Sequence, residues 1–137
     1  MSGGAAALTA SAAAEVTADR APKAGETARV SLVIESDIDY GSVSTECEFG
    51  ACFLDLYKTA SGGAKEPLIV LIHGGGWIHG QYSSKALPRI TRPAKDLASA
   101  GYVVLAIDYP GAKNVPYVPG TTMEEDAVND AVAWART

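Results

Sequence analysis

The sequence predicts an α/β protein with a mostly parallel sheet, an antiparallel pair of strands at its start, and flanking helices. Two continuous apolar segments, 68–72 and 102–107, predict strands buried on both faces, the pattern of parallel strands. A helical pattern lies between them, and strand, helix, strand in succession indicates a right-handed parallel crossover. With 137 residues, of which 47% are hydrophobic and 20% charged, the chain can form one domain with its own core.

The N-terminal segment lacks the features of a packed element. Residues 1–25 are rich in Ala, Gly, Ser and Thr, and no Lys or Arg precedes Arg20. Thr9 and Ser11 interrupt the alanine run, so the basic and apolar parts of a secretory signal are missing. We therefore expect a disordered tail over residues 1–25, with a degraded signal or an organelle transit segment as the less favoured alternative, and a folded domain over 26–137. A cytoplasmic location is expected, with secretion left open.

Segments 29–34 and 51–57 predict two antiparallel strands, because turn-forming residues separate them. The chain's only cysteines, Cys47 and Cys52, lie in this region, where a hairpin loop could bring them together in a disulfide. We favour free or merely structural thiols, and leave the disulfide open. Two thiols with no histidine nearby in sequence do not make a zinc site, which usually has four ligands.

Two prolines shape the segment between the apolar strands. Pro88 and Pro93 argue against one unbroken helix over residues 83–100. A helix that begins at about residue 92 or 93 fits better, because proline is tolerated in the first helical turn. Gly101 is the expected end of this helix.

The C-terminal segment carries the clearest helix signals. Thr121 and Thr122 each have a glutamate three residues on, so either can form a capping box. Acidic residues follow at the start of this helix and Arg136 lies near its end, so the charges at both ends are opposite in sign to the helix dipole. Apolar residues at helical spacing form a stripe that is expected to pack on the sheet: Ala127, Val128, Ala131, Trp134 and Ala135.

Three consecutive glycines follow the 68–72 strand directly. Glycine permits positive φ and lets backbone N–H groups come close to a ligand atom. A buried strand that ends in convergent N–H groups is suited to bind negative charge. The structural alternative is a tight turn into a helix, with no ligand.

The sequence HGGGW at residues 73–77 resembles the HGGG oxyanion loop of α/β-hydrolase esterases and lipases, which follows the third strand of that fold. The LDLY sequence at 54–57 looks like a strand of the group related to bacterial feruloyl esterases. Residues 101–109 look like the fourth strand, with its Asp-Tyr ending. The resemblance covers about residues 30–137 and implies a partial α/β-hydrolase fold, its N-terminal part only.

The resemblance also implies roles for the loop. The N–H groups of Gly75 and Gly76 would stabilise the oxyanion of the tetrahedral intermediate, and Gly74 would give the loop freedom to turn. His73 would support the loop rather than act as the base. Trp77 would lie beside the acyl pocket, although an ordinary core position fits it equally well.

The rest of a serine-esterase site is missing from this sequence. Such enzymes need a nucleophile, a histidine base and an acid, and the nucleophile lies in G-x-S-x-G. No G-x-S-x-G occurs here, and both histidines, His73 and His79, belong to the glycine loop. We expect the N-terminal part of a carboxylic-ester hydrolase that uses no cofactor and no metal, a truncation or fragment inactive on its own. Its longer parent would act on a small-molecule ester.

Two other functions are weighed against the esterase. A shortened hydrolase-like domain could bind a partner through its open sheet edge without catalysis. A dinucleotide-binding unit is less favoured, because the G-x-G-x-x-G fingerprint counted from Gly74 ends on His79, and Asp108 lies beyond the usual offset of about 20 residues.

Charge and hydropathy limit the partners. A net charge of −5 and a pI near 4.9 argue against nucleic acid and anionic membranes. No apolar run approaches the ~20 residues that span a bilayer. In the resembling fold the 68–72 strand pairs with 102–107 on one side and with a later strand on the other. An unpaired apolar edge is therefore expected, with self-association through it.

Overall fold

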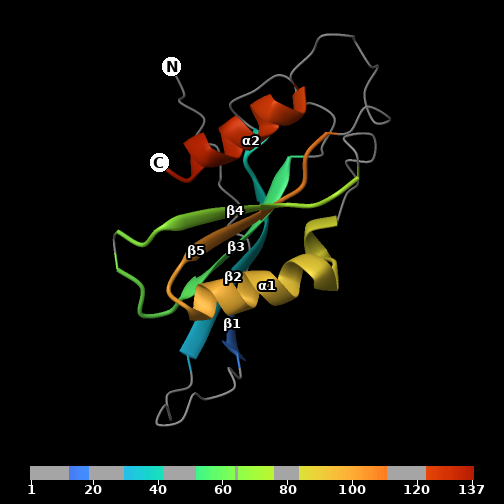
Figure 1. Ribbon diagram of the computed structural model, residues 1–137. Helices are drawn as coiled ribbons and strands as arrows, with labels where there is room; N and C mark the ends of the chain where they lie inside the picture. Colours follow the sequence, from blue (N-terminus) through green and yellow to red (C-terminus); the bar gives the residue numbers. More distant parts are fainter. Residues whose placement is uncertain (1–12, 19–29, 42–51, 64, 76–83, 111–122) are drawn as a thin grey trace, which may run out of the picture.

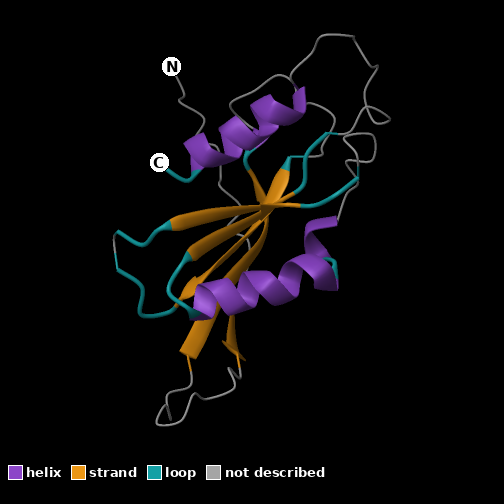
Figure 2. Cartoon of the chain, in the orientation of Figure 1, coloured by secondary structure: helices purple, strands orange, loops and turns teal. Residues whose placement is uncertain are grey.

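The described residues form a five-stranded mixed sheet with one α-helix on each side (Figures 1 and 2). The computed structural model describes residues 13–18, 30–41, 52–63, 65–75, 84–110 and 123–137. The strand order is β1-β2-β3-β5-β4. The elements are β1 (Ala13–Ala18), β2 (Val30–Asp39), β3 (Phe53–Thr59), β4 (Leu68–Ile72), the 3₁₀ helix η3 (Ser84–Ala86), α1 (Pro88–Ser99), β5 (Val103–Ile107) and α2 (Met123–Trp134).

The pairing of the strands confirms the α/β class but not a mostly parallel sheet. The pairs β1–β2, β2–β3 and β3–β5 are antiparallel, and only β4–β5 is parallel among the described strands. Parallel neighbours need a crossover connection, and the described elements contain one, from β4 through α1 to β5. The predicted N-terminal antiparallel pair corresponds to β2 and β3.

The predicted 68–72 strand is β4, and it lies at an edge of the described sheet, where it pairs with β5 alone. Two of its large apolar side chains are partly exposed, Leu68 by 38% and Ile72 by 41%. The open apolar edge expected from the sequence is thus present among the described strands.

The prediction of a disordered tail over residues 1–25 is wrong for six of its residues. Ala13–Ala18 form β1, which pairs antiparallel with β2 from Ala13 opposite Glu35 to Ala18 opposite Val30. An edge strand gains its ladder of hydrogen bonds from a neighbour, so a weak local pattern is sufficient for it. The remainder of that tail lies outside the described residues.

Helix α1 begins at Pro88, four residues earlier than Arg92, so the expected start was wrong. Proline fits a first helical position because its fixed φ suits the helix and the N–H that it lacks has no partner there. Pro93 lies inside the helix, where it removes only the bond to the Arg89 carbonyl. The predicted end at Gly101 is confirmed.

The end of α1 is a Schellman motif. Gly101 has a φ of 99°, which favours glycine. Its N–H donates to the Ala98 carbonyl at 3.0 Å, and the Tyr102 N–H donates to the Leu97 carbonyl at 3.2 Å. The chain therefore turns sharply from the helix into β5.

Alternate residues of β5 point to opposite faces of the sheet, and each face has its own core. Leu105 and Ile107 pack with Ala127 and Ala131 of α2. Val104 and Ala106 pack on the other face, under α1. The stripe predicted for the C-terminal helix is confirmed for four of its residues, since Val128 and Trp134 also lie against the α2-side core, whereas Ala135 follows the end of α2 and is exposed. The capping threonines lie outside the described residues.

Cys52 is disulfide-bonded, so the preference for free thiols was wrong for this residue. Cys47, the only other cysteine of the sequence, lies outside the described residues. Cys52 is 2% exposed, and its carbonyl accepts the Tyr40 N–H at 3.0 Å, which joins the β2 and β3 ends. Disulfides persist in oxidising compartments, so this bond does not favour the cytoplasmic location, which stays a prediction.

Two buried tyrosines predict a loss of stability at alkaline pH. Burial, then the charge of Asp55, raises the pKa of Tyr57 to about 12, although Lys85 opposes this. Burial and the charges of three aspartates, with Asp108 the strongest, raise the pKa of Tyr40 further.

Because an unfolded tyrosine titrates near pH 10, the stabilisation is complete below pH 10 and is lost as the pH rises through the folded-state pKa values. We expect the free energy of unfolding to fall above pH 10 by up to about 1.4 kcal/mol per pH unit for each tyrosine. Urea denaturation between pH 8 and 12 measures this. Tyr57→Phe should reduce the slope, and an unchanged slope would contradict the assignment.

Candidate functional site

The candidate site lies where the two parallel strands end. Ile72 of β4 is opposite Ile107 of β5, so the residues that follow, His73 and Asp108, leave the sheet at the same edge. In open α/β sheets, ligands bind outside the carboxyl ends of the strands. The crossover through α1 therefore brings the glycine loop and the Asp108-Tyr109 pair together.

His73 is held from several sides. Its side chain is buried, and its ring stacks on Tyr109 with centroids 4.3 Å apart and an interplanar angle of 13°. The Tyr109 hydroxyl donates to the His73 carbonyl at 2.9 Å. His73 Nδ1 lies 2.9 Å from the Gly74 carbonyl, which can only accept, so Nδ1 carries the hydrogen. This geometry fits a histidine that supports the loop.

Asp108 joins both ends of the loop to β5. Its Oδ1 lies 3.4 Å from His73 Nε2, and no hydrogen bond to this ring nitrogen is found among the described residues. The same oxygen accepts the backbone N–H of Lys85 at 2.9 Å. The Asp108 carbonyl accepts the hydroxyl of the buried Tyr40. Asp108 is 2% exposed, so it is not placed to grip a ribose, and the dinucleotide interpretation loses its acidic residue.

Lys85 is the main residue of this region that the sequence did not reveal. It belongs to η3 and is 3% exposed. Its Nζ lies 2.7 Å from Oδ1 of Asp37 and 2.7 Å from Oδ1 of Asp55. Burial alone would lower the pKa of Lys85, but the hydrogen bonds and charges of the two carboxylates raise it above its usual value. The lysine is therefore charged.

The backbone of β2 is irregular where it contacts this ion cluster. The register of β2 against β3 shifts between Glu35 and Ile38, as at a β-bulge. Inside the bulge Asp37 has a φ of 58°, a left-handed conformation that aspartate tolerates better than most residues. Its N–H donates to Asp55 Oδ1 at 3.0 Å. Asp55 thus accepts from both the Asp37 backbone and the Lys85 side chain.

The glycine loop is described as far as Gly75. Among the described residues no hydrogen bond is found to the N–H of Gly74 or Gly75. Gly74 has no positive φ, and a Cβ added to it would meet nothing within 4 Å, so the freedom to turn expected there is not used. Gly76, Trp77 and His79 lie outside the described residues.

Other kinds of site are not found in the part of the chain that the structure describes. There, no three His, Cys, Asp or Glu side chains are grouped so that they could hold a metal ion. Within the same residues, every helix is too short or too polar to cross a membrane.

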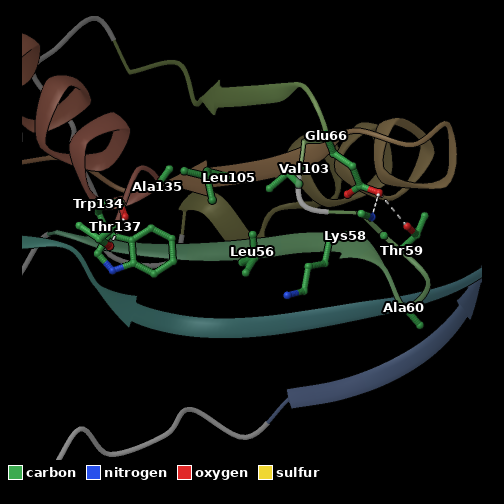
Figure 3. A pocket seen from close by; sticks show the side chains of 12 residues that line it. Leu56, Lys58, Thr59, Ala60, Glu66, Val103, Leu105, Trp134, Ala135 and Thr137 are labelled. Atoms are coloured by element: carbon green, nitrogen blue, oxygen red, sulfur yellow. Dashed lines mark hydrogen bonds between the residues drawn. The ribbon is translucent and has the colours of Figure 1, made fainter.

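A cavity of about 420 Å³ lies on the α2 side of the sheet (Figure 3). Trp134 lies at one end, Leu56 and Leu105 in the middle, and Lys58 and Glu66 at the other end. Its wall includes Val103, Thr59, Ala60, Gly62, Gly63, Ala135 and Thr137. Because β5 begins at Val103 and ends at Ile107, the cavity extends toward the ends of the strands away from the glycine loop. It is not part of the candidate site.

The chain is similar to a protein family and to a curated relative. The model of the BD-FAE family matches residues 54–137, more than half of the chain. A non-reducing polyketide synthase, ausA of Emericella nidulans, is 38% identical over 87 residues, which cover 61% of this chain and 3% of the synthase.

Solved structures give the same answer for the fold. Two structures of esterase B from Lactobacillus rhamnosis, one of them inhibited by a tributyrin phosphonate, match with a TM-score of 0.54 and 25% sequence identity. The match covers 75% of this chain and 29% of the esterase. The fold is therefore that of an α/β-hydrolase esterase, its N-terminal part only.

Proposed function

Because the chain belongs to the BD-FAE family of esterase-like α/β hydrolases, we propose that it carries the oxyanion loop of a carboxylic-ester hydrolase. The single observation that supports this most is the position of Gly75. It follows β4 at the carboxyl end of the parallel pair, and no described residue accepts its N–H. We infer that this N–H is available to a ligand.

The chemistry of ester cleavage needs such a donor. When a nucleophile attacks the ester carbonyl, the carbonyl oxygen gains a full negative charge in the tetrahedral intermediate. Backbone N–H groups fixed in advance stabilise that charge, and one donor contributes about 3–4 kcal/mol to the lowering of the barrier. We assign this role to the N–H groups of Gly75 and Gly76, with His73 as the support of the loop.

The remaining groups of the reaction are proposed to come from sequence outside these 137 residues. A serine would attack, and a histidine oriented by an acid would accept its proton. The chain spans 29% of esterase B and 3% of the polyketide synthase. The substrate of the longer parent would be a small-molecule ester, and the reaction would need no metal and no cofactor.

An assay on two proteins tests the proposal. We expect the 137-residue chain to hydrolyse p-nitrophenyl acetate no faster than buffer, because it supplies no nucleophile. A hybrid in which residues 54–137 replace the matching segment of esterase B should hydrolyse it. Cooperative thermal unfolding shows that the hybrid is folded. A folded hybrid without turnover, or turnover by the chain alone, would contradict the proposal.

The exposed edge of β4 favours a second candidate, a non-catalytic module that binds through this edge. Leu68 and Ile72 are 38% and 41% exposed there, and an unpaired apolar edge is a template for another strand. Self-association is the simplest form of such binding. Sedimentation velocity of the unsubstituted chain should show dimers or larger species. The Leu68→Lys variant should sediment as a monomer. A weak edge contact should still be populated at a protein concentration of about 100 μM. A chain that sediments as a monomer at this concentration would argue against the binding module.

A further inference from the structure

The cavity on the α2 side of the sheet is separate from the glycine loop, and its two ends differ in chemistry (Figure 3). Its volume of about 420 Å³ falls within the range of about 300–1,000 Å³ that small-molecule sites usually have. Leu56 of β3 and Leu105 of β5 are register partners and form its middle. Lys58 and Glu66 lie at one end, and Trp134 lies at the other. The cavity thus has an apolar body and a charged end.

The Glu66 carboxylate has a fixed position in the wall of this cavity. Its Oε1 accepts the Gly63 N–H at 3.2 Å and the Thr59 hydroxyl at 3.4 Å (Figure 3). Gly62 leaves room for this arrangement, because a Cβ there would lie 2.6 Å from Oε1 and 2.7 Å from Oε2. The Thr59 carbonyl accepts the Gly62 N–H at 3.2 Å, which closes the turn. The carboxylate is therefore positioned in advance by the turn that follows β3.

The two charged groups of this end do not satisfy each other. Closure of the turn accounts for the hydrogen bonds to Glu66 Oε1, whereas Oε2 has no donor among the described residues. The Lys58 ammonium points away from Glu66 (Figure 3), and no ion pair of Lys58 is found in the described part of the chain. The charged end therefore offers an acceptor and a cation separately. A ligand head group that carries both an ammonium and a carboxylate complements both.

The opposite end is closed by an aromatic side chain with a defined position. Trp134 packs against the α2-side core. Its carbonyl accepts the Thr137 hydroxyl at 2.7 Å and the Thr137 N–H at 3.2 Å, which fixes the end of the chain beside it. An indole offers a large, flat apolar contact area and favours a second aromatic ring. This end is therefore suited to the apolar side chain of a ligand.

We propose that this cavity binds a small zwitterion with a large apolar side chain, the chemistry of a free aromatic or apolar α-amino acid. The ligand ammonium donates to Glu66 Oε2, and the ligand carboxylate pairs with Lys58. The ligand side chain lies over Leu56 and Leu105 and extends toward Trp134. Pairing both charges avoids the cost of placing either one in the cavity without a partner. The site shares no residue with the glycine loop, so it does not depend on ester hydrolysis.

Titration of the 137-residue chain with L-phenylalanine, followed by ¹H–¹⁵N NMR at constant pH and ionic strength, tests this. The reporters are the indole N–H of Trp134 and the amide of Gly63, one at each end of the cavity. Phenethylamine and 3-phenylpropionate share the ring but lack the carboxylate and the ammonium, respectively. We expect saturable shifts with a dissociation constant of about 1 mM or below for L-phenylalanine. Either analogue should bind at least about tenfold more weakly, because it loses one charge-assisted hydrogen bond.

Gly62→Ala and Gly63→Ala form a matched pair of variants. A Cβ at position 62 displaces the end of the flexible Glu66 side chain, whereas a Cβ at position 63 meets nothing within 4 Å. Gly62→Ala should raise the dissociation constant of L-phenylalanine about tenfold, and Gly63→Ala should leave it within about twofold. Lys58→Met should abolish the preference for L-phenylalanine over phenethylamine, because the ligand carboxylate then has no partner.

The dispersion of the NMR spectrum shows whether each variant is folded. If Gly62→Ala is not folded, Glu66→Gln takes its place, since it keeps the size of the side chain and removes its charge. The proposal would be overturned by shifts that do not saturate up to about 20 mM L-phenylalanine, or by equal affinities for the three compounds. Equal losses in the two glycine variants would overturn it as well. None of these results bears on the proposed oxyanion loop, which lies at the other end of the strands.

Discussion

Replacing Lys85 with methionine is expected to lower the free energy of unfolding by about 3–5 kcal/mol. The side chains of Lys85 and Asp55 are 4% and 6% exposed, so the substitution leaves a buried carboxylate without its cation. Methionine is flexible and of similar length, so little of the loss should come from an empty cavity. Urea denaturation at pH 7, followed by circular dichroism, measures the change.

Matched variants separate charge from other effects. Lys65→Met removes a charge from an exposed position and should change the stability by no more than about 0.5 kcal/mol. The double substitution Lys85→Met with Asp55→Leu leaves no unpaired buried charge, and should recover most of the loss. A cost below about 1 kcal/mol for Lys85→Met would show that the cluster is not buried in solution.

The second large effect is expected for Gly75→Pro in the hybrid with esterase B. Proline has no N–H, so the substitution removes the proposed oxyanion donor, and its fixed φ of about −65° also replaces the φ of 158° that Gly75 has. The kcat for p-nitrophenyl acetate should fall by about 10²–10³-fold, the usual effect of losing such a donor. The melting temperature of the variant is measured alongside, so that loss of activity in a folded protein is established.

Gly74→Ala is the matched control, since it keeps its N–H and a Cβ at this position meets nothing within 4 Å. The hybrid with Gly74→Ala should keep its kcat within about threefold, as expected where a substitution touches no donor. A similar loss in both variants, or no loss in Gly75→Pro, would contradict the assignment of the donor.

The elements that the sequence predicted well are those with a strong local pattern. The apolar runs that became β4 and β5 and the stripe that became α2 each carry their own signal. Gly101 likewise marks the end of α1 by its own conformation. The α/β class and the place of the glycine loop followed from these elements.

What the sequence did not show depends on residues that meet only in the fold. Asp37, Asp55 and Lys85 are separated by 18 and 30 positions, and no spacing rule connects a bulge, a strand and a 3₁₀ helix. Strand β1 depends on its neighbour β2, and the antiparallel β3–β5 pair is a property of the sheet. One local signal was available, since a proline such as Pro88 can start a helix as well as prevent one.

The most direct test of the central claim is a titration of the unsubstituted chain with butylphosphonate, a tetrahedral anion, at constant ionic strength, followed at the Gly75 amide. A donor waiting for negative charge should give a downfield shift that saturates, while the amide of Gly101, at the opposite end of β5, should not move. A Gly75 amide that does not shift, or one already protected from hydrogen exchange by the chain itself, would contradict the oxyanion role.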